Sequence, residues 1–282
     1  MNNPHNHFFT ALALICACFL AGCKTLVDSA PKPSAQVMDT RISGLSLDSI
    51  ELMFDVEVAN PYTTNLPLTD LTYSLASGGS TFMDGKVTPT GSIPARGKKM
   101  IQIPATVPFR SLLTALKSVK PGAVVPYAAQ FKIGVNVPVV GRMEIPLSKN
   151  GELPVPAVPQ VELTSLVMNK FSFDQITASA KLKVKNTNQF ALDITKMGIN
   201  LALAGKEVGG SKLANMINLP AGESQSMDVS LSFSPSVVGM SLMNMLRGNQ
   251  IDYQMSGLME ADTRFGPMAL PFKHGGNAAV TK

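Results

Sequence analysis

The 282-residue sequence has no tryptophan, few cysteines and histidines, and little charge. Charged residues make up 15% of the chain, and the net charge of +5 is spread thinly, with no basic run and no patch in which basic and aromatic residues alternate. We therefore expect no nucleic-acid partner, because phosphate backbones are captured by concentrated positive charge. Hydrophobic residues make up 45% of the chain, too large a share for a disordered protein, and the length suits two ordinary domains.

The N-terminal segment has the features of an export signal. Residues 8–22 form an apolar run that is too short to span a bilayer comfortably, which takes roughly 20 helical residues. The run ends in Leu20-Ala21-Gly22-Cys23, which resembles the lipobox of bacterial lipoproteins. The resemblance implies that residues 1–22 are a signal peptide and that Cys23 is acylated and becomes the mature N-terminus. The alternative, a buried helix with a core cysteine, does not explain the change in composition directly after Cys23.

Residues 23–36 mix serine, alanine, proline and charge without periodicity, as a tether does. Several acyl chains on Cys23 would hold the protein firmly on its membrane, because each buried methylene contributes about 0.8 kcal/mol. In lipoproteins of Gram-negative bacteria an aspartate after the acylated cysteine tends to retain the protein at the inner membrane, and this sequence has Lys24 there. The resemblance therefore implies an exported, lipid-anchored protein at the outer membrane that faces the periplasm.

Removal of residues 1–22 would leave one cysteine and one histidine, Cys23 and His274. The mature chain then has no internal disulfide and no cysteine-based metal site, so its stability must come from packed cores. Serine or cysteine nucleophiles lack a histidine base, since His274 lies in a glycine-rich segment after the last predicted strand. Carboxylates do not converge by any visible spacing. We therefore expect a protein that is not an enzyme, with no catalytic residue, no cofactor and no metal ion.

The rest of the chain repeats itself. At an offset of 126 residues Val56–Asn60 aligns with Leu182–Asn186, and Pro94-Ala95 aligns with Pro220-Ala221. Further along, the offset shortens to 125. Such a period is too long for a solenoid repeat and suits tandem domains. We predict two domains, at residues 37–149 and 160–273. A proline-rich and semi-stiff linker at residues 150–159 joins them, and a C-terminal tail follows at residues 274–282.

Within each copy the dominant period is two, which predicts antiparallel strands with one wet face. Apolar residues stand at every second position in Ile50–Val58, Tyr127–Val137, Ile176–Val184, Met227–Phe233 and Ile251–Met255. Two segments have helical spacing instead, residues 109–119 and residues 234–247. We therefore predict that each copy is a β-sandwich of about 100 residues with one short inserted helix.

Several motifs of the first copy resemble the WHy domain of LEA type 2 (LEA14-like) proteins. They are an amphipathic strand ending in Asn60-Pro61-Tyr62, a hydrophobic strand at Leu68–Ala76, and a Pro94–Gly97 turn before an Ile/Val strand. The second copy departs, with Asn186-Thr187-Asn188 where the family favours Asn-Pro-Asn. The resemblance implies a mostly β fold of two tandem fibronectin-III/immunoglobulin-like β-sandwiches, each with one short inserted helix. It also implies a link to water stress or desiccation, and no catalytic residues.

Three smaller features allow more than one interpretation. Asn60 and Asn186 each follow a strand, where the side chain can hydrogen-bond nearby backbone, and we interpret them as structural rather than ligand-binding. Residues 205–212 lack the order of a phosphate-binding loop, and we predict a turn there. Five methionines can form an adaptable apolar groove or, as we expect, pack in the core: Met240, Met243, Met245, Met255 and Met259.

The outward-facing charges of one strand pair differ in sign between the copies. They are Glu51, Asp55 and Glu57 in the first copy and Lys181, Lys183 and Lys185 in the second. Both rows can be ordinary solvated faces. The sharper hypothesis is that the duplicated domains diverged to bind different partners, or each other, through complementary charge.

Together these features predict a non-catalytic, membrane-anchored lipoprotein that protects or scaffolds components of the cell envelope under desiccation or related stress. Its partners would be the membrane, through the acyl chains, and an envelope protein. The alternative is a periplasmic carrier for a lipid or another apolar ligand, which needs a cavity between the sheets or beneath the helix.

Overall fold

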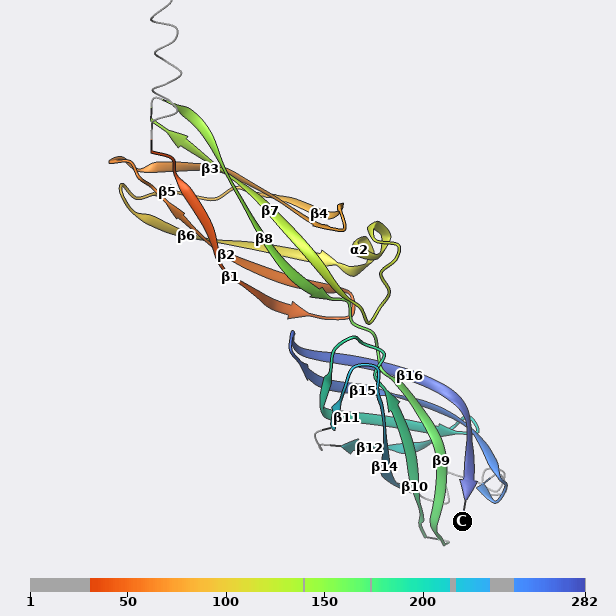
Figure 1. The fold of residues 1–282 in the computed structure, drawn as a ribbon. Helices are drawn as coiled ribbons and strands as arrows, with labels where there is room; N and C mark the ends of the chain where they lie inside the picture. Colours follow the sequence, from red (N-terminus) through yellow and green to blue (C-terminus); the bar gives the residue numbers. More distant parts are fainter. Residues whose placement is uncertain (1–30, 139, 173, 214–216, 234–245, 282) are drawn as a thin grey trace, which may run out of the picture.

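The computed structural model describes residues 31–138, 140–172, 174–213, 217–233 and 246–281. Most of these residues are in strands, and the helix among them is α2 (Phe109–Ala115). The predicted mostly β fold is therefore confirmed. The chain forms two repeat units, the first unit at Ser34–Pro154 and the second unit at Gln160–Thr281, which lie end to end (Figure 1).

The first unit is built from two sheets that face each other. Its strands are β1 (Ser34–Leu45), β2 (Ser49–Ala59), β3 (Leu66–Ser77), β4 (Ser80–Val87), β5 (Ser92–Ile93), β6 (Lys98–Pro108), β7 (Val124–Val137) and β8 (Gly141–Pro154). One sheet has the order β1-β2-β6, and the other has the order β4-β3-β7-β8, with β5 paired to β3. The rings of Phe54 and Phe131, one from each sheet, meet edge to face with centroids 5.0 Å apart. This contact places the core between the sheets.

The second unit has the same strands in a more continuous sheet. They are β9 (Gln160–Phe171), β10 (Ile176–Lys185), β11 (Leu192–Leu203), β12 (Lys206–Leu213), β13 (Ile217–Leu219), β14 (Ser224–Phe233), β15 (Gln250–Thr263) and β16 (Gly266–Thr281). Their order is β12-β11-β15-β16-β9-β10-β14, with β13 paired to β11. The sheet is continuous because the end of β16 pairs in parallel with β9. In the first unit the matching strand β8 ends at Pro154, where the chain leaves for the second unit.

The two units correspond at the offset present in the sequence. β1 and β9 begin at residues 34 and 160, β3 and β11 at 66 and 192, and β7 and β15 at 124 and 250, each pair 126 residues apart. β8 and β16 begin at 141 and 266, which are 125 apart. The predicted duplication is therefore confirmed in the order and the spacing of the strands.

Alternating apolar side chains form the cores, as predicted. In β2 the residues Ile50, Leu52, Phe54, Val56 and Val58 are at most 2% exposed, and the residues between them are exposed or half-buried. The matching positions of β10 are buried in the same way. Each unit has its own hydrophobic core. Because burial of one large aliphatic side chain contributes about 1.5–3 kcal/mol, each row contributes substantially to the stability of its own unit.

The helix predicted at residues 109–119 is shorter in the structure. α2 ends at Ala115, since Leu116 has left the helical conformation with φ −111° and ψ 75°. A short helix is enough to bury Phe109 and Leu112, and the later apolar residues pack at the edge of the same core. The helix predicted at residues 234–247 falls almost entirely on residues 234–245, which lie outside the described residues.

The strands extend past three predicted boundaries. β1 begins at Ser34, inside the predicted tether at residues 23–36. β8 continues to Pro154, into the predicted linker at residues 150–159. β16 continues to Thr281 and takes in most of the predicted tail at residues 274–282. The predicted linker and tail are to this extent wrong.

Tyrosine rings explain why glycine-containing segments form strands here. A Cβ atom on Gly151 would lie 2.6 Å from the hydroxyl oxygen of Tyr127 on the adjacent strand β7. A Cβ atom on Gly276 would lie 3.4 Å from the ring of Tyr253 on the adjacent strand β15. These glycines let an aromatic ring lie over the neighbouring backbone, a device that the two units share.

Candidate functional site

The described residues do not contain a group of three or more His, Cys, Asp or Glu side chains placed to hold a metal ion. Among the same residues, no helix is both long enough and apolar enough to cross a membrane. The predicted lipid attachment site, Cys23, lies outside them. His274 was expected in a tail, but it is an exposed residue of β16, and its ring centroid lies 6.1 Å from that of Tyr253. The structure instead positions polar surface residues in the loops, at the contact between the two units and on the charged faces of the strands.

Asn60, at the end of β2, organises the loops at one end of the first unit. Its side chain is buried, and its nitrogen lies within hydrogen-bond distance of the carbonyl oxygens of Thr64 (2.8 Å), Ile93 (3.2 Å) and Pro94 (2.9 Å). Its side-chain oxygen accepts a hydrogen bond from the backbone N–H of Tyr62 (2.8 Å). One side chain thus ties the β2–β3 loop to the β5–β6 turn.

Asn186 makes the same contacts in the second unit. Its side-chain nitrogen reaches the carbonyl oxygens of Phe190 (2.8 Å), Leu219 (3.1 Å) and Pro220 (3.2 Å), and its oxygen accepts from the N–H of Asn188 (3.0 Å). The side chain is fully buried. The structural role predicted for both asparagines is therefore confirmed.

The segment Asn186-Thr187-Asn188, where the second copy departs from the family pattern, forms the contact between the two units, here called the junction. Asn188 stands where the first unit has Tyr62. Its side-chain oxygen accepts from the backbone N–H of Ala157 (2.7 Å), and its side-chain nitrogen donates to the Ala157 carbonyl (3.0 Å). The N–H of Gln189 donates to the Gly122 carbonyl (2.7 Å), and its side-chain oxygen accepts from the N–H of Val124 (2.9 Å). This loop therefore binds both the linker and the first unit.

Gly122 allows the close approach of the two units. Its φ is +95°, and a Cβ atom there would lie 2.5 Å from the carbonyl oxygen of Thr187. Its N–H donates to the carbonyl of Val155 (2.6 Å), a residue that is 1% exposed. The segment predicted as a semi-stiff spacer is thus hydrogen-bonded on both sides, at Val155 and at Ala157. The signal that could have identified the junction is the Asn-Thr-Asn departure itself.

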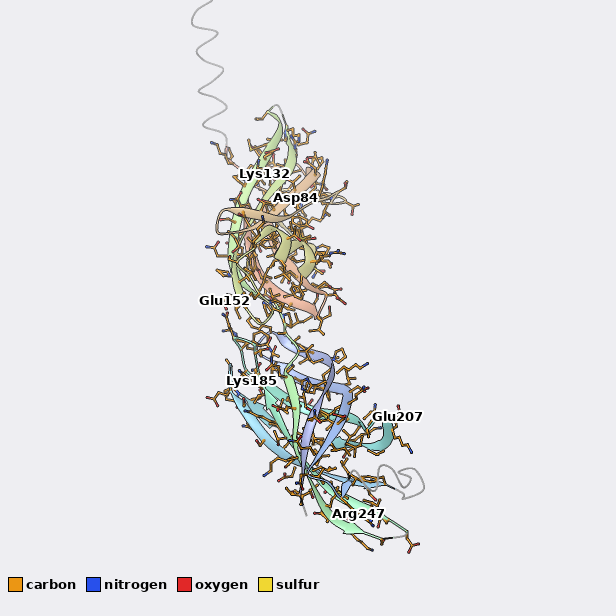
Figure 2. All side chains as sticks on the ribbon, turned by 90° about the vertical axis from the view of Figure 1, so that its right-hand side faces the viewer. Asp84, Lys132, Glu152, Lys185, Glu207 and Arg247 are labelled. Atoms are coloured by element: carbon orange, nitrogen blue, oxygen red, sulfur yellow. The ribbon has the colours of Figure 1, made fainter. Side chains whose placement is uncertain are left out.

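Side-chain packing and one ion pair add to the junction. Leu45 and Leu47, from the β1–β2 turn of the first unit, pack against the core of the second unit. Arg264, in the β15–β16 turn, forms an ion pair of 3.0 Å with Glu152, which Figure 2 labels at the lower end of the first unit. The Arg264 guanidinium also lies 4.5 Å from the ring centroid of Phe265. Apolar, hydrogen-bonded and ionic contacts therefore meet at this junction.

The two predicted charge rows differ in how they are partnered. In the first unit Asp55 forms an ion pair with Arg41, and Glu57 forms one with Lys98 at 2.8 Å. In the second unit the lysine row is exposed and forms no ion pair with any other described residue: Lys181, Lys183 and Lys185. Their cross-strand neighbours include Asp228 and Glu162. Two of the three acidic residues are thus paired with basic side chains, while the lysine row is exposed and has no such partner among the described residues.

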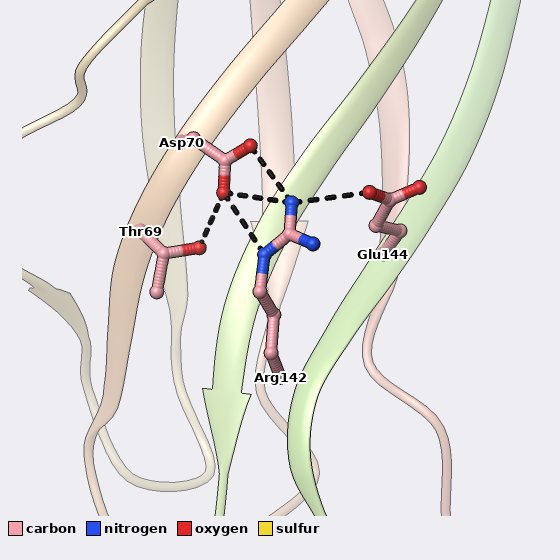
Figure 3. Close-up of polar contacts among 4 residues, drawn as sticks. All are labelled: Thr69, Asp70, Arg142 and Glu144. Carbon is pink, nitrogen blue, oxygen red and sulfur yellow. Dashed lines mark hydrogen bonds and ion pairs between the residues drawn. The ribbon is translucent and has the colours of Figure 1, made fainter.

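Another ion pair crosses the middle strand of a sheet in the first unit (Figure 3). Arg142 on β8 reaches the Asp70 carboxylate on β3 at 2.9 Å, over Gly134 of β7, where a Cβ atom would lie 2.3 Å from a carboxylate oxygen of Asp70. The pKa of Asp70 is lowered, first by a hydrogen bond from the Thr69 hydroxyl and second by Arg142. Arg142 also contacts Glu144 at 3.1 Å. Gly134 therefore permits a polar network that spans three strands.

The same place in the second unit carries the opposite arrangement. Lys196 stands at the position of Asp70 and forms an ion pair of 2.8 Å with Glu260, which stands at the position of Gly134. The pKa of Lys196 is raised, chiefly by its hydrogen bond to Glu260. The duplication has thus kept an ion pair at this site and changed its residues.

Surface depressions also correspond between the units. One lies over β3, β4 and β7, where Figure 2 labels Asp84 and Lys132, and its counterpart lies over β11, β12 and β15, next to Asn200 and Lys212. Both are open to solvent and not enclosed, and their linings expose apolar as well as polar surface. The predicted alternative of an apolar-ligand carrier gains no support from them. Met255 and Met259 are core residues, as expected, and the other three methionines considered lie outside the described residues.

Residues 205–212 contain the predicted turn. Ala204 and Gly205, with φ of 47° and 78°, connect β11 to β12, and the rest of the segment belongs to β12. Positive φ at both central residues is typical of a tight hairpin turn. The segment is therefore part of a hairpin and does not form a phosphate-binding loop.

Two buried apolar cores, repeated structural asparagines and polar outer faces define a mostly β protein made from one duplicated β-sandwich unit. The family model for late embryogenesis abundant protein (LEA_2) matches residues 55–151 and 181–276, which are 126 residues apart at their starts and 125 at their ends. The chain therefore belongs to the LEA type 2 family and contains two copies of its characteristic segment.

The match to each named relative covers a stretch about as long as one copy of the repeated unit. A Glycine max protein named desiccation protectant protein Lea14 homolog is 34% identical over 132 residues, 47% of this chain and 87% of the relative. An Arabidopsis thaliana protein named probable desiccation-related protein LEA14 is 31% identical over 126 residues, 45% of this chain and 83% of the relative. The solved structure of AT1g01470 from Arabidopsis thaliana is 30% identical, covers 46% of this chain and 85% of its own, and has a TM-score of 0.38.

Proposed function

We propose that this protein is a non-catalytic, lipid-anchored LEA type 2 protein that protects or scaffolds components of the bacterial envelope during desiccation or related stress. The observation that carries the proposal is the double match to a family whose named members are desiccation-related proteins.

The anchor follows from the N-terminal sequence. Leu20-Ala21-Gly22-Cys23 is similar to a lipobox, and acylation of Cys23 would hold the chain at a membrane, with Lys24 favouring the outer membrane of a Gram-negative host. β1 begins eleven residues after Cys23, at Ser34. Since an extended chain spans at most about 3.5 Å per residue, the first unit would stay within about 40 Å of the acylated residue.

The units would act through their outer faces. Charged and amide side chains cover strands whose positions are fixed by two hydrophobic cores and by the junction, so one molecule presents two different polar faces at a fixed spacing. Contacts with envelope proteins would then depend on complementary charge rather than on a deep cleft. The acyl chains would keep these faces close to the membrane.

Deletion of the gene from its bacterial host tests the proposal. We expect the deletion strain to lose viability and envelope integrity, measured by entry of a membrane-impermeant dye, after drying and rehydration. The wild-type gene should restore both, and a Cys23→Ser gene should restore them only in part. Equal survival of the deletion and parent strains after drying and osmotic shock would contradict the proposed role.

A further inference from the structure

The two ends of the first unit face different surroundings. One end contacts the second unit through the β1–β2 turn and residues 122–124. The other end, here called the free end, contains the start of β1, the β2–β3 loop, the β5–β6 turn and the β7–β8 turn (Figure 1). Strand register places the start of β1, the end of β2 and the start of β6 together, because Ser34 pairs with Ala59 and Ala59 pairs with Lys98. The N-terminal segment therefore joins the first unit at its free end.

Basic residues concentrate at the free end. Arg96 is exposed at the tip of the β5–β6 turn, where its φ is +51° and its N–H donates to the Tyr62 carbonyl (2.8 Å). Lys98 is 64% exposed and pairs with Glu57, while the Lys99 ammonium donates to the Thr90 carbonyl (2.7 Å). The segments 59–66, 88–99 and 137–141 contain no aspartate or glutamate. The free end therefore carries a net positive charge.

The second unit provides an internal comparison. At the positions of Arg96, Lys98 and Lys99 it has Gly222, Ser224 and Gln225, which are uncharged. The same end of the second unit lies against the first unit, through Asn188, Gln189 and Arg264. In the second unit, where this end contacts the first unit, these three positions carry no cations. In the first unit, where this end is free and adjoins the N-terminal segment, all three positions carry cations.

We propose that the free end of the first unit lies on the anionic phospholipid headgroups of the anchoring membrane, with Arg96, Lys98 and Lys99 as the contact residues. The inference rests on the proposed lipid anchor, because the short segment after Cys23 keeps this end near the bilayer. Each basic residue close to an anionic surface raises membrane partitioning roughly fivefold, and the effect fades within a Debye length of about 8 Å. Contact with the surface also orients the second unit away from the membrane, because the units lie end to end (Figure 1).

Lysine footprinting on vesicles tests this contact. The mature chain has one cysteine, Cys23, so it can be coupled through that residue to a maleimide lipid in vesicles of phosphatidylcholine, with or without phosphatidylglycerol. An amine-acylating reagent and peptide mass spectrometry then report the reactivity of each lysine. We expect several-fold protection of Lys98 on the anionic vesicles, lost in high salt, and no protection of Lys181, Lys183 and Lys185. Equal reactivity of Lys98 on both vesicle types overturns the proposal.

Charge-removal variants give a second readout. A chain that starts at residue 23 and carries Cys23→Ser has no acyl chain, and its sedimentation with phosphatidylglycerol vesicles at low ionic strength measures the surface contact alone. We expect Arg96→Gln/Lys98→Gln/Lys99→Gln to reduce the bound fraction by more than tenfold, while the matched variant Lys181→Gln/Lys183→Gln/Lys185→Gln changes it little. Equal loss in the two variants, or no loss in the first, overturns the assignment of these residues.

The two experiments separate this inference from the proposed anchor. Chemical coupling replaces acylation, so protection of Lys98 can be found even if Cys23 is never acylated in cells. Conversely, fatty-acid labelling of Cys23 in cells can succeed while Lys98 is equally reactive on both kinds of vesicle. The first result would contradict the anchor alone, and the second would contradict the surface contact alone.

Discussion

Asn188 and Ala157 are joined by two hydrogen bonds of 2.7 and 3.0 Å, so that a buried side chain of the second unit holds the backbone of the linker as a neighbouring strand would. Asn188 also donates to the side-chain oxygen of Asn186 (2.9 Å), which connects the linker to the asparagine network of the second unit. The place where the second copy departs from the family pattern is thus the place where the units are joined.

Asn188→Ala should loosen the junction. It leaves the N–H and carbonyl of Ala157 without their partners, and an unsatisfied buried group costs about 1–3 kcal/mol. We expect a lower free energy of unfolding, by about 2 kcal/mol, and faster protease cleavage at residues 155–159, measured by mass spectrometry of the fragments. Asn200→Ala, at an exposed position of β11, is the matched control. Cleavage as slow as in the wild type would show that other contacts hold the linker.

Asn60→Ala and Asn186→Ala should each destabilise the unit that contains the asparagine. Each substitution removes an amide that bridges a loop and a turn in a buried position, and we expect a loss of about 3 kcal/mol in the free energy of unfolding. Urea unfolding measures the effect, with the exposed Asn136→Ala as control. A loss below that of the control would contradict the structural role.

Gly151→Ala and Gly276→Ala form a graded pair. The new methyl group would lie 2.6 Å from the Tyr127 hydroxyl in the first case and 3.4 Å from the Tyr253 ring in the second. Because overpacking of this kind typically costs about 1–3 kcal/mol, we expect Gly151→Ala to lower the melting temperature clearly and Gly276→Ala to lower it less. The reverse order in a thermal melt would show that the tyrosines do not set the constraint.

The ion pair between Asp70 and Arg142 should contribute stability only above acidic pH. The pKa of Asp70 is lowered in the folded protein, by the Thr69 hydroxyl first and by Arg142 second. The contribution of Asp70 to the free energy of unfolding is therefore present above its unfolded-state pKa of about 3.9. It is lost as the pH falls through the lowered pKa of the folded state.

Asp70→Asn tests this dependence. Because the pair is solvent-exposed, we expect the variant to be less stable than the wild type by at most about 1 kcal/mol at neutral pH, and the difference to shrink below about pH 4. Urea unfolding of both proteins at neutral and acidic pH measures it. A difference that is independent of pH would assign the effect to packing around Gly134 instead of charge.

The parts of the fold with local signals could be predicted from the sequence. Alternation identified β2 and β10, because each apolar residue in them points to the core, and self-alignment identified the duplication, because the strands kept their spacing. The roles of Asn60 and Asn186 followed from their position directly after a strand. In each case the evidence lies within about ten consecutive residues or in their repetition.

The junction and the end of β16 depend on partners distant in sequence. Gln189 bonds to Val124, 65 residues away, and neither residue has a local pattern that indicates the other. Gly275 and Gly276 suggest a tail when considered alone, and only the Tyr253 ring on β15 shows why glycine suits a strand there. Contacts of this kind arise from how strands pack, which composition and periodicity do not specify.

Fatty-acid labelling in cells tests the central claim, that this duplicated LEA type 2 chain acts from a membrane to which Cys23 attaches it. Cells that produce the wild-type protein or Cys23→Ser are grown with an alkyne-labelled fatty acid, and the protein is then followed through membrane fractionation. The account predicts labelled wild-type protein in the outer-membrane fraction, and an unlabelled Cys23→Ser protein released from that fraction. An unlabelled wild-type protein that fractionates like Cys23→Ser would contradict it.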